Sequence, residues 1–238
     1  MRSHGIVCGM PTALMDRLAS LVVPPLCVAC REPELGGEAL CGQCVDALVP
    51  LAPGQCGHRS VVLARAWAPF SYEGVARRVV MALKARSATQ AARFMAGAIN
   101  ARAPAGVLAG GVLVPVPGQP AGNRRRGFDH AHEIARELGR LASLDVAGAL
   151  RRAPVRPQVG LGRAERGANA RASVRVHSAE VPRGGRAILV DDVYTTGATL
   201  DACALALLGA GASEVLALCF ARTMRRRPGH LAHDPVDT

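Results

Sequence analysis

The stretch AILVDDVYTTGATL, residues 187–200, places the strictest constraint on how this chain can fold. Its apolar run at residues 188–190 predicts a buried β-strand, and the small residues after the two aspartates predict a tight loop. A helix is expected over residues 199–208, ended by Gly209, and a further strand over residues 214–220. Because two parallel strands need a crossover between them, this order predicts a parallel sheet.

The preceding part of the chain repeats the alternation of strand and helix. The segment ARAWAPFSYEG, residues 64–74, predicts a pair of strands, and residues 110–118 predict a β-branched strand that prolines end. Helices are predicted over residues 75–85, over residues 89–101, and over residues 128–142 with Ile134, Leu138 and Leu141 on one side. The predicted fold class is therefore α/β, a parallel sheet flanked by helices on both faces.

Two cysteine pairs, CVAC and CGQC, give the spacing C-x2-C-x10-C-x2-C. Four thiolates in two such turns are the ligand set of tetrahedral Zn²⁺, and a closed shell of four cysteines indicates a structural metal. A disulfide pair and a redox dithiol are the competing interpretations, but neither accounts for two pairs in a reducing compartment. The predicted zinc ligands are Cys27, Cys30, Cys41 and Cys44. Cys56 and His58 add only two ligands, so a turn with a free thiol is expected there.

Asp191 and Asp192 follow the predicted strand directly, at the carboxyl end where open α/β sheets bind their ligands. We therefore expect them to face a ligand, where two carboxylates can accept hydrogen bonds from adjacent ribose hydroxyls. Backbone amides of the next loop can converge on a phosphate, helped by the positive end of the following helix. That loop consists of Thr195, Thr196, Gly197, Ala198 and Thr199. A magnesium ion would be carried mainly by the phosphates of the ligand.

Three other interpretations of this stretch were weighed. A Walker B strand also ends in carboxylates, but it requires a GxxxxGK loop, and Lys84 is the only lysine in the chain. A glycosidase-like pair needs carboxylates on opposite sides of one bond, which adjacent residues do not naturally provide. A turn capped by Asp and Thr needs neither the second aspartate nor the full set of threonines and glycine.

The net charge of +11 favours anionic partners, because all but one of the 29 basic residues are arginine. Arginine grips phosphate and carboxylate with a planar fork, although a genome-wide arginine bias would give the same composition. An aromatic content of 3% argues against a dedicated single-strand binder, which stacks bases on aromatic side chains. Arg225, Arg226 and Arg227 are expected in a solvated tail that adds sequence-independent attraction to DNA.

The stretch 187–200 closely resembles the phosphoribosyl-diphosphate (PRPP) signature of type I phosphoribosyltransferases. Together with CVAC and CGQC, the segments VPVPGQPAGNRRRGFDHA (114–131) and QVGLGRAER (158–166) resemble the competence protein F (ComF) family over residues 14–223. That family couples a small zinc-binding module to a phosphoribosyltransferase-type domain. It is associated with DNA uptake in naturally competent bacteria.

The resemblance implies roles for residues at matching positions. Asp191 and Asp192 would be the catalytic ribose-hydroxyl ligands, and residues 195–199 the 5′-phosphate loop. Val116, Pro117 and Gly118 occupy the strand end where pyrophosphate would bind. Here the sequence departs from the family, with GQPAGNRRRGFD where a basic or hydroxylated residue often follows the proline, and with Asp129 where Asn is frequent.

Two arginine groups lie in segments predicted to be loops. Arg124, Arg125 and Arg126 would neutralise a multiply charged leaving group, or form a solvated basic turn. The region 151–185, rich in Arg, Gly and Pro, predicts a long loop with short strands at its edges. Within it, Arg163 and Arg166 could belong to a flap that closes over bound ligand.

These observations leave three functions open. The first is a cytoplasmic phosphoribosyltransferase, a transferase of the glycosyltransferase class, that binds PRPP with Mg²⁺ and transfers ribosyl phosphate to an unknown acceptor. The second is a non-enzymatic DNA-uptake factor that binds nucleotide, DNA or a helicase partner. The third is a salvage enzyme for a standard base, which the short segment after residue 220 makes less favoured.

Four regions are predicted along the chain. They are an amphipathic helix at residues 1–23, a zinc-binding module at 24–60, a phosphoribosyltransferase-like domain at 61–223 and a basic tail at 224–238. Asp16 and Arg17 interrupt the first region, so a packed or partner-binding helix is favoured over a secretory signal or membrane anchor. Prolines break the uncharged residues 103–123, and no transmembrane segment is predicted.

Overall fold

The computed structural model describes residues 25–58, 60–85, 88–118, 128–152, 174–177 and 180–224. The amphipathic region 1–23, the arginines at 124–126, 163, 166 and 225–227, and most of the long loop at 151–185 lie outside the described residues. The predicted strand pair, the later helices and the Asp-Asp stretch all lie within them.

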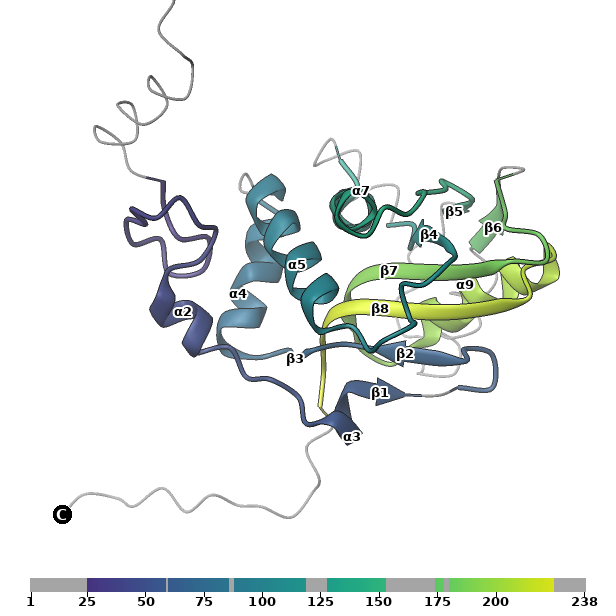
Figure 1. The fold of residues 1–238 in the computed structure, drawn as a ribbon, viewed down its shortest axis with the longest axis horizontal. Coiled ribbons are helices and arrows are strands. Elements are labelled where there is room, and N and C mark those ends of the chain that lie inside the picture. Colours follow the sequence, from purple (N-terminus) through teal and green to yellow (C-terminus); the bar gives the residue numbers. More distant parts are fainter. Residues whose placement is uncertain are drawn as a thin grey trace, which may run out of the picture.

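Two long parallel strands form the centre of the main sheet. Strand β7 (Arg186–Tyr194) pairs with β8 (Glu214–Arg222) from Arg186↔Glu214 to Tyr194↔Arg222. Strand β4 (Val112–Pro115) lies parallel to β7 on its other side. The sheet has the order β1-β2-β8-β7-β4, with β3 also paired to β8 (Figure 1). The predicted parallel α/β sheet is therefore confirmed.

The segment predicted as a strand pair forms two strands that do not pair with each other. Strand β2 (Arg65–Trp67) and strand β3 (Phe70–Ser71) each pair in parallel with successive parts of β8. The antiparallel partner of β2 is the short strand β1 (Gly57–His58) at the sheet edge. The prediction was wrong on the pairing because β8 offers a continuous row of backbone groups that local alternation in sequence does not reveal.

Helices cover both faces of the sheet, and two hydrophobic clusters fill the space between the layers. Helices α4 (Gly74–Leu83), α5 (Ala88–Arg102) and α7 (His130–Ala142) lie on one face (Figure 1). Helix α9 (Ala198–Gly209) covers the other face. Alternate residues of β7 belong to different clusters. Ile188 and Val190 pack in the cluster under α4, α5 and α7, and Ala187 and Leu189 pack in the cluster under α9.

The helices fall close to the ranges predicted from sequence, with two differences. In α7 the buried apolar side chains are Ala131, Ile134, Ala135 and Leu138, whereas Leu141 in the last turn is 40% exposed. Strand β7 continues beyond the apolar run at residues 188–190, where a strand was predicted, to Tyr194, because β8 also extends and supplies pairing partners. The loop before α9 is correspondingly short.

The cysteine-rich segment packs onto the same core as α4 and α5. It contains helices α2 (Gly42–Asp46) and α3 (Pro53–Cys56), and its buried residues share one cluster with Val79 and Val80 of α4. So short a segment cannot build a core alone, and here it shares the core of the larger domain. At the other end of the molecule, β5 (Leu150–Arg152) and β6 (Val174–Val176) form a two-stranded antiparallel sheet beside α9.

Among the described residues, none of the helices has the length and apolar character needed to cross a bilayer. The segment 103–118, which was predicted not to span, contains the end of a loop and strand β4 instead of a helix.

Two helical glycines provide a matched test of this packing. A Cβ on Gly139 in α7 would lie 2.7 Å from the Leu144 carbonyl oxygen, whereas a Cβ on Gly97 in α5 would meet nothing within 4 Å. We expect Gly139→Ala to lower the free energy of unfolding by about 1–3 kcal/mol through overpacking. Gly97→Ala should raise it by about 0.5–1 kcal/mol through helix propensity. Urea denaturation measures both, and equal effects of the two variants would contradict the described contact of α7 with the segment after it.

Candidate phosphoribosyl site and cysteine cluster

Three of the predicted ligand-binding segments meet at the carboxyl ends of β4 and β7. The Val116 N–H donates to the Val190 carbonyl at 3.0 Å, which places residues 116–118 beside Asp191. The Gly118 N–H donates to Asp129 Oδ2 at 3.1 Å, and Asp129 also caps α7 by accepting from the Ala131 N–H. Asp129 therefore fixes the segment after β4 to the start of α7.

The two carboxylates leave β7 on opposite faces, because successive side chains in a strand alternate. Asp192 points to the face of α4 and α7, where its Oδ2 lies 2.8 Å from Lys84 Nζ and 3.9 Å from His130 Nε2. It is only 6% exposed, so it faces the core more than was expected from sequence. Asp191 lies towards Cys203 of α9 and is partly exposed, and its Oδ1 accepts from the Asp192 N–H at 2.9 Å.

Asp191 and Asp192 are two neighbouring carboxyl groups that are partly withdrawn from water, and this changes the pKa of Asp191. Burial, followed by the neighbouring carboxylate of Asp192, raises the pKa of Asp191 well above its usual range, and the positive charge of Lys84 opposes the shift. Burial and the charge of Asp191 also raise the pKa of Cys203 to about 12. A cationic or hydroxyl-bearing ligand would therefore stabilise a charge that the fold itself disfavours at Asp191.

The loop between β7 and α9 is compact and exposes its threonines. Thr195 and Thr196 are exposed, and the Ala198 N–H donates to Thr196 Oγ1 at 3.4 Å. Gly197 immediately precedes α9 and has a left-handed backbone, with φ of 81°. A Cβ at this position would lie 2.6 Å from Tyr194 Oη, so the loop requires glycine there both for its backbone conformation and for space. The first N–H groups of α9 are thereby presented beside the Asp pair.

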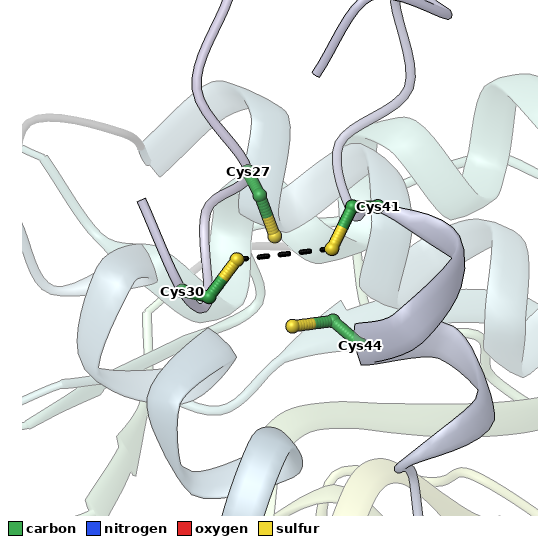
Figure 2. Close-up of side chains that lie close together, drawn as sticks. All are labelled: Cys27, Cys30, Cys41 and Cys44. Atoms are coloured by element: carbon green, nitrogen blue, oxygen red, sulfur yellow. Dashed lines mark hydrogen bonds between the residues drawn. The ribbon is translucent and has the colours of Figure 1, made fainter. Parts of the chain in front are cut away.

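The four predicted zinc ligands converge on one point (Figure 2). Their Sγ atoms all lie within 4.8 Å of one another, and Cys30 Sγ and Cys41 Sγ are 3.7 Å apart. Zinc–sulfur bonds of about 2.3 Å make a tetrahedron whose edges are about 3.8 Å. The cluster is therefore the right size for Zn²⁺, and all seven cysteines in the described residues are free thiols.

Backbone geometry prepares the first turn of this cluster. The Cys27 N–H donates to the Glu32 carbonyl, and Arg31 takes a left-handed conformation with φ of 69° to close the turn. Burial raises the pKa of the Cys27 thiol, but backbone hydrogen bonds, those from Cys30 and Cys41 foremost, outweigh it and lower that pKa to about 6. Because metals bind the thiolate, these hydrogen bonds favour the form that a metal requires at Cys27, whereas burial raises the pKa of Cys44 to about 12.

Cys56 lies outside the cluster. Its Sγ donates to the Leu51 carbonyl oxygen at 3.1 Å, and burial raises the pKa of its thiol. The expected free thiol is present, but Cys56 lies at the end of the short helix α3 and not in a turn.

Sequence reasoning missed two residues at the Asp pair, Lys84 and His130. His130 is the first residue of α7, inside a segment that had been singled out for its resemblance to the family. Lys84 follows the last turn of α4, and its signal was present in the composition, because it is the only lysine in the chain. In the sequence analysis, Lys84 was used only as evidence against a P-loop.

Comparison with known proteins supports the assignment of this region. Residues 121–236 match the family described as phosphoribosyl transferase domain. The chain therefore carries a phosphoribosyltransferase-like domain. The matched residues include the Asp pair, the loop and α9, and they begin just after the segment that follows β4. No curated protein matches the chain.

Among the solved structures that match, three examples show how remote the similarity is. An allosteric regulatory enzyme of purine biosynthesis is 22% identical, with a TM-score of 0.37, over 54% of this chain and 25% of that one. Glutamine PRPP amidotransferase from B. subtilis, complexed with ADP and GMP, has the same identity and TM-score over 54% and 26%. The protein TT1426 from Thermus thermophilus is 20% identical, with a TM-score of 0.31, over 59% and 85%. The chain thus spans about a quarter of the length of the first two proteins.

Gly197 offers a test of the loop geometry. Gly106 has a similar left-handed φ of 79° but nothing within 4 Å of its would-be Cβ, so it is a matched control. We expect Gly106→Ala to cost about 1–2 kcal/mol of unfolding free energy from the backbone alone. Gly197→Ala should cost more, because the Tyr194 ring must also move. Urea denaturation of both variants checks this, and an equal loss would show that Tyr194 does not constrain the loop.

Proposed function

We propose that this chain is a PRPP-binding, phosphoribosyltransferase-like protein of the ComF type. The observation that carries the proposal is the meeting of Asp191 and Asp192 with the Gly197 loop at the carboxyl ends of β4 and β7, within a phosphoribosyltransferase-like domain. Association with DNA uptake and location in the cytoplasm are part of the proposal. They rest on the resemblance and on the free thiols of the cysteine cluster.

The chemistry available at this edge suits a phosphorylated ribose. Ribose hydroxyls can donate to the two carboxylates, and the 5′-phosphate can accept from N–H groups of residues 195–199 and the first turn of α9. Since the carboxylates lie on opposite faces of β7, the sugar must lie across the end of the strand. The diphosphate would then extend towards residues 116–118, and the arginines at 124–126 are proposed to neutralise its charge. Carboxylate and phosphate oxygens are also the ligands of Mg²⁺, which would neutralise charge on the diphosphate.

Transfer of ribosyl phosphate needs no protein nucleophile. The bond from the sugar C1 to the diphosphate oxygen breaks, the diphosphate leaves with the electron pair, and an acceptor nucleophile forms the new bond to C1. The protein contributes by positioning the reactants and by stabilising the separating charges. Arg163 and Arg166 are proposed to belong to a flap that excludes water during this step. The acceptor is a nucleophile that the described residues do not specify.

A second function has one supporting observation. A groove of about 770 Å³ lies between the cysteine-rich segment and α4, and Arg31, Arg77 and Arg78 line it together with Met81. Exposed arginines around an apolar floor suit an acidic protein partner or a nucleic acid backbone. A non-enzymatic DNA-uptake factor that contacts DNA or a helicase would use this groove.

Calorimetry with PRPP tests the leading proposal. We expect Mg²⁺-dependent binding that the double variant Asp191→Asn, Asp192→Asn weakens at least tenfold, because two charged hydrogen-bond acceptors are lost. The control is Asp46→Asn, which changes an exposed residue of α2 and should bind PRPP with the affinity of the wild type. Equal affinity of the double variant would sink the assignment of the site. Absence of binding by the wild type would favour the second function.

The zinc site is tested separately by metal analysis. We propose that the four clustered thiolates hold one structural Zn²⁺, and we expect about one zinc per chain. Cys44→Ser should lose the metal and lower the stability of the whole protein, because Cys44 belongs to the cluster that α4 and α5 share. Cys56→Ser is the matched control and should keep its zinc. Less than about half a zinc per wild-type chain would contradict a closed structural site.

A further inference from the structure

We propose that Lys84 is a ligand-binding residue of the phosphoribosyl site, which neutralises Asp192 in the free protein and contacts the anionic phosphates of the phosphorylated ribose in the complex. The inference rests on the proposed function and extends it to a residue from α4. The phosphoribosyl transferase domain match begins at residue 121, so Lys84 lies outside it.

The position of Lys84 suits this double contact. Its Nζ lies 2.8 Å from Asp192 Oδ2, yet its side chain is 37% exposed whereas that of Asp192 is 9% exposed. One end of the ion pair is thus fixed in the sheet and the other reaches solvent at the ligand-binding edge. Because Lys84 follows the last turn of α4, its flexible stem can turn towards a ligand without moving the helix.

The two aspartates at the carboxyl end of β7 make a positively charged side chain favourable for binding an anionic ligand. Two adjacent carboxylates would repel a multiply anionic ligand, and the charge of Lys84 reaches both of them. His130 is further from Asp192, at 3.9 Å. Arg222 is held in place, because its Nη1 donates to the Gln55 and Gly57 carbonyls and its guanidinium lies 5.2 Å from the centre of the Tyr194 ring.

The use of lysine here is a further observation. Of 29 Lys and Arg residues in the chain, Lys84 is the only one that is not arginine. It forms an ion pair with Asp192, the buried aspartate of the candidate site. Lysine presents a compact ammonium group on a flexible stem, whereas arginine presents a rigid planar fork. A cation that must fit against a buried carboxylate and still reach a ligand is better supplied by lysine.

Because Lys84 is the only lysine, amine-specific chemistry reports on this one side chain. We would acetylate the native protein with an N-hydroxysuccinimide ester of acetate and follow Lys84 by mass spectrometry, with the α-amino group of the chain as internal control. PRPP with Mg²⁺ should slow acetylation of Lys84 at least fivefold and leave the α-amino rate unchanged. Asp192→Asn should accelerate acetylation of Lys84 in the absence of ligand.

Calorimetry on charge variants completes the test. Lys84→Met should weaken binding of PRPP with Mg²⁺ at least tenfold, and Lys84→Arg should restore part of the loss. Arg93→Met is the matched control, because it removes one positive charge from an ion pair with Glu137 away from the site and should leave the affinity unchanged. An equal loss in Arg93→Met would show a general charge effect and overturn the inference.

The failures of the two proposals are distinguishable. If the wild type binds PRPP and depends on the Asp pair, but Lys84→Met binds equally well and the ligand gives no protection, the role of Lys84 is overturned while the site stands. If the wild type does not bind PRPP, both proposals fail. The protection of Lys84 by ligand is measured on wild-type protein, so a folding defect in Lys84→Met does not remove the test.

Discussion

The parallel pairing of β7 with β8 is the interaction on which the rest of the structure depends. It runs from Arg186↔Glu214 through Asp191↔Cys219 and on to Tyr194↔Arg222, and it carries the Asp pair to the carboxyl edge of the sheet. Strands β2, β3 and β4 all attach to one of these two strands. The Thr223 N–H donates to the Tyr194 carbonyl at 3.0 Å, so the same pairing also holds the start of the loop before α9.

The site and the cysteine cluster are linked through one hydrophobic core. Cys27 and Cys44 belong to the cluster that includes Val79 and Val80 of α4, and α4 leads directly to Lys84. A metal that orders the cysteine-rich segment would therefore also support the helix that presents Lys84 to Asp192. On this account the metal would act on ligand binding through packing and not through contact with the ligand.

Local patterns in the sequence predicted the elements, and long-range packing decided the details that were missed. The apolar run at 188–190 and the spacing of the cysteines are local signals, and both led to the structure that is observed. The pairing of β2 and β3 with β8, and the burial of Asp192 under α4, depend on segments far apart in sequence. Strand alternation alone could have shown that Asp191 and Asp192 point to opposite faces, had β7 been predicted to continue beyond them.

A crystal structure of the protein with PRPP and Mg²⁺ would test the central claim most directly. The account predicts the 5′-phosphate on the backbone N–H groups of residues 195–199, the ribose hydroxyls on Asp191 and Asp192, and the diphosphate beside residues 116–118. A ligand bound elsewhere, for example in the groove lined by Arg31, Arg77 and Arg78, would contradict the account. So would an empty sheet edge in crystals grown at saturating ligand.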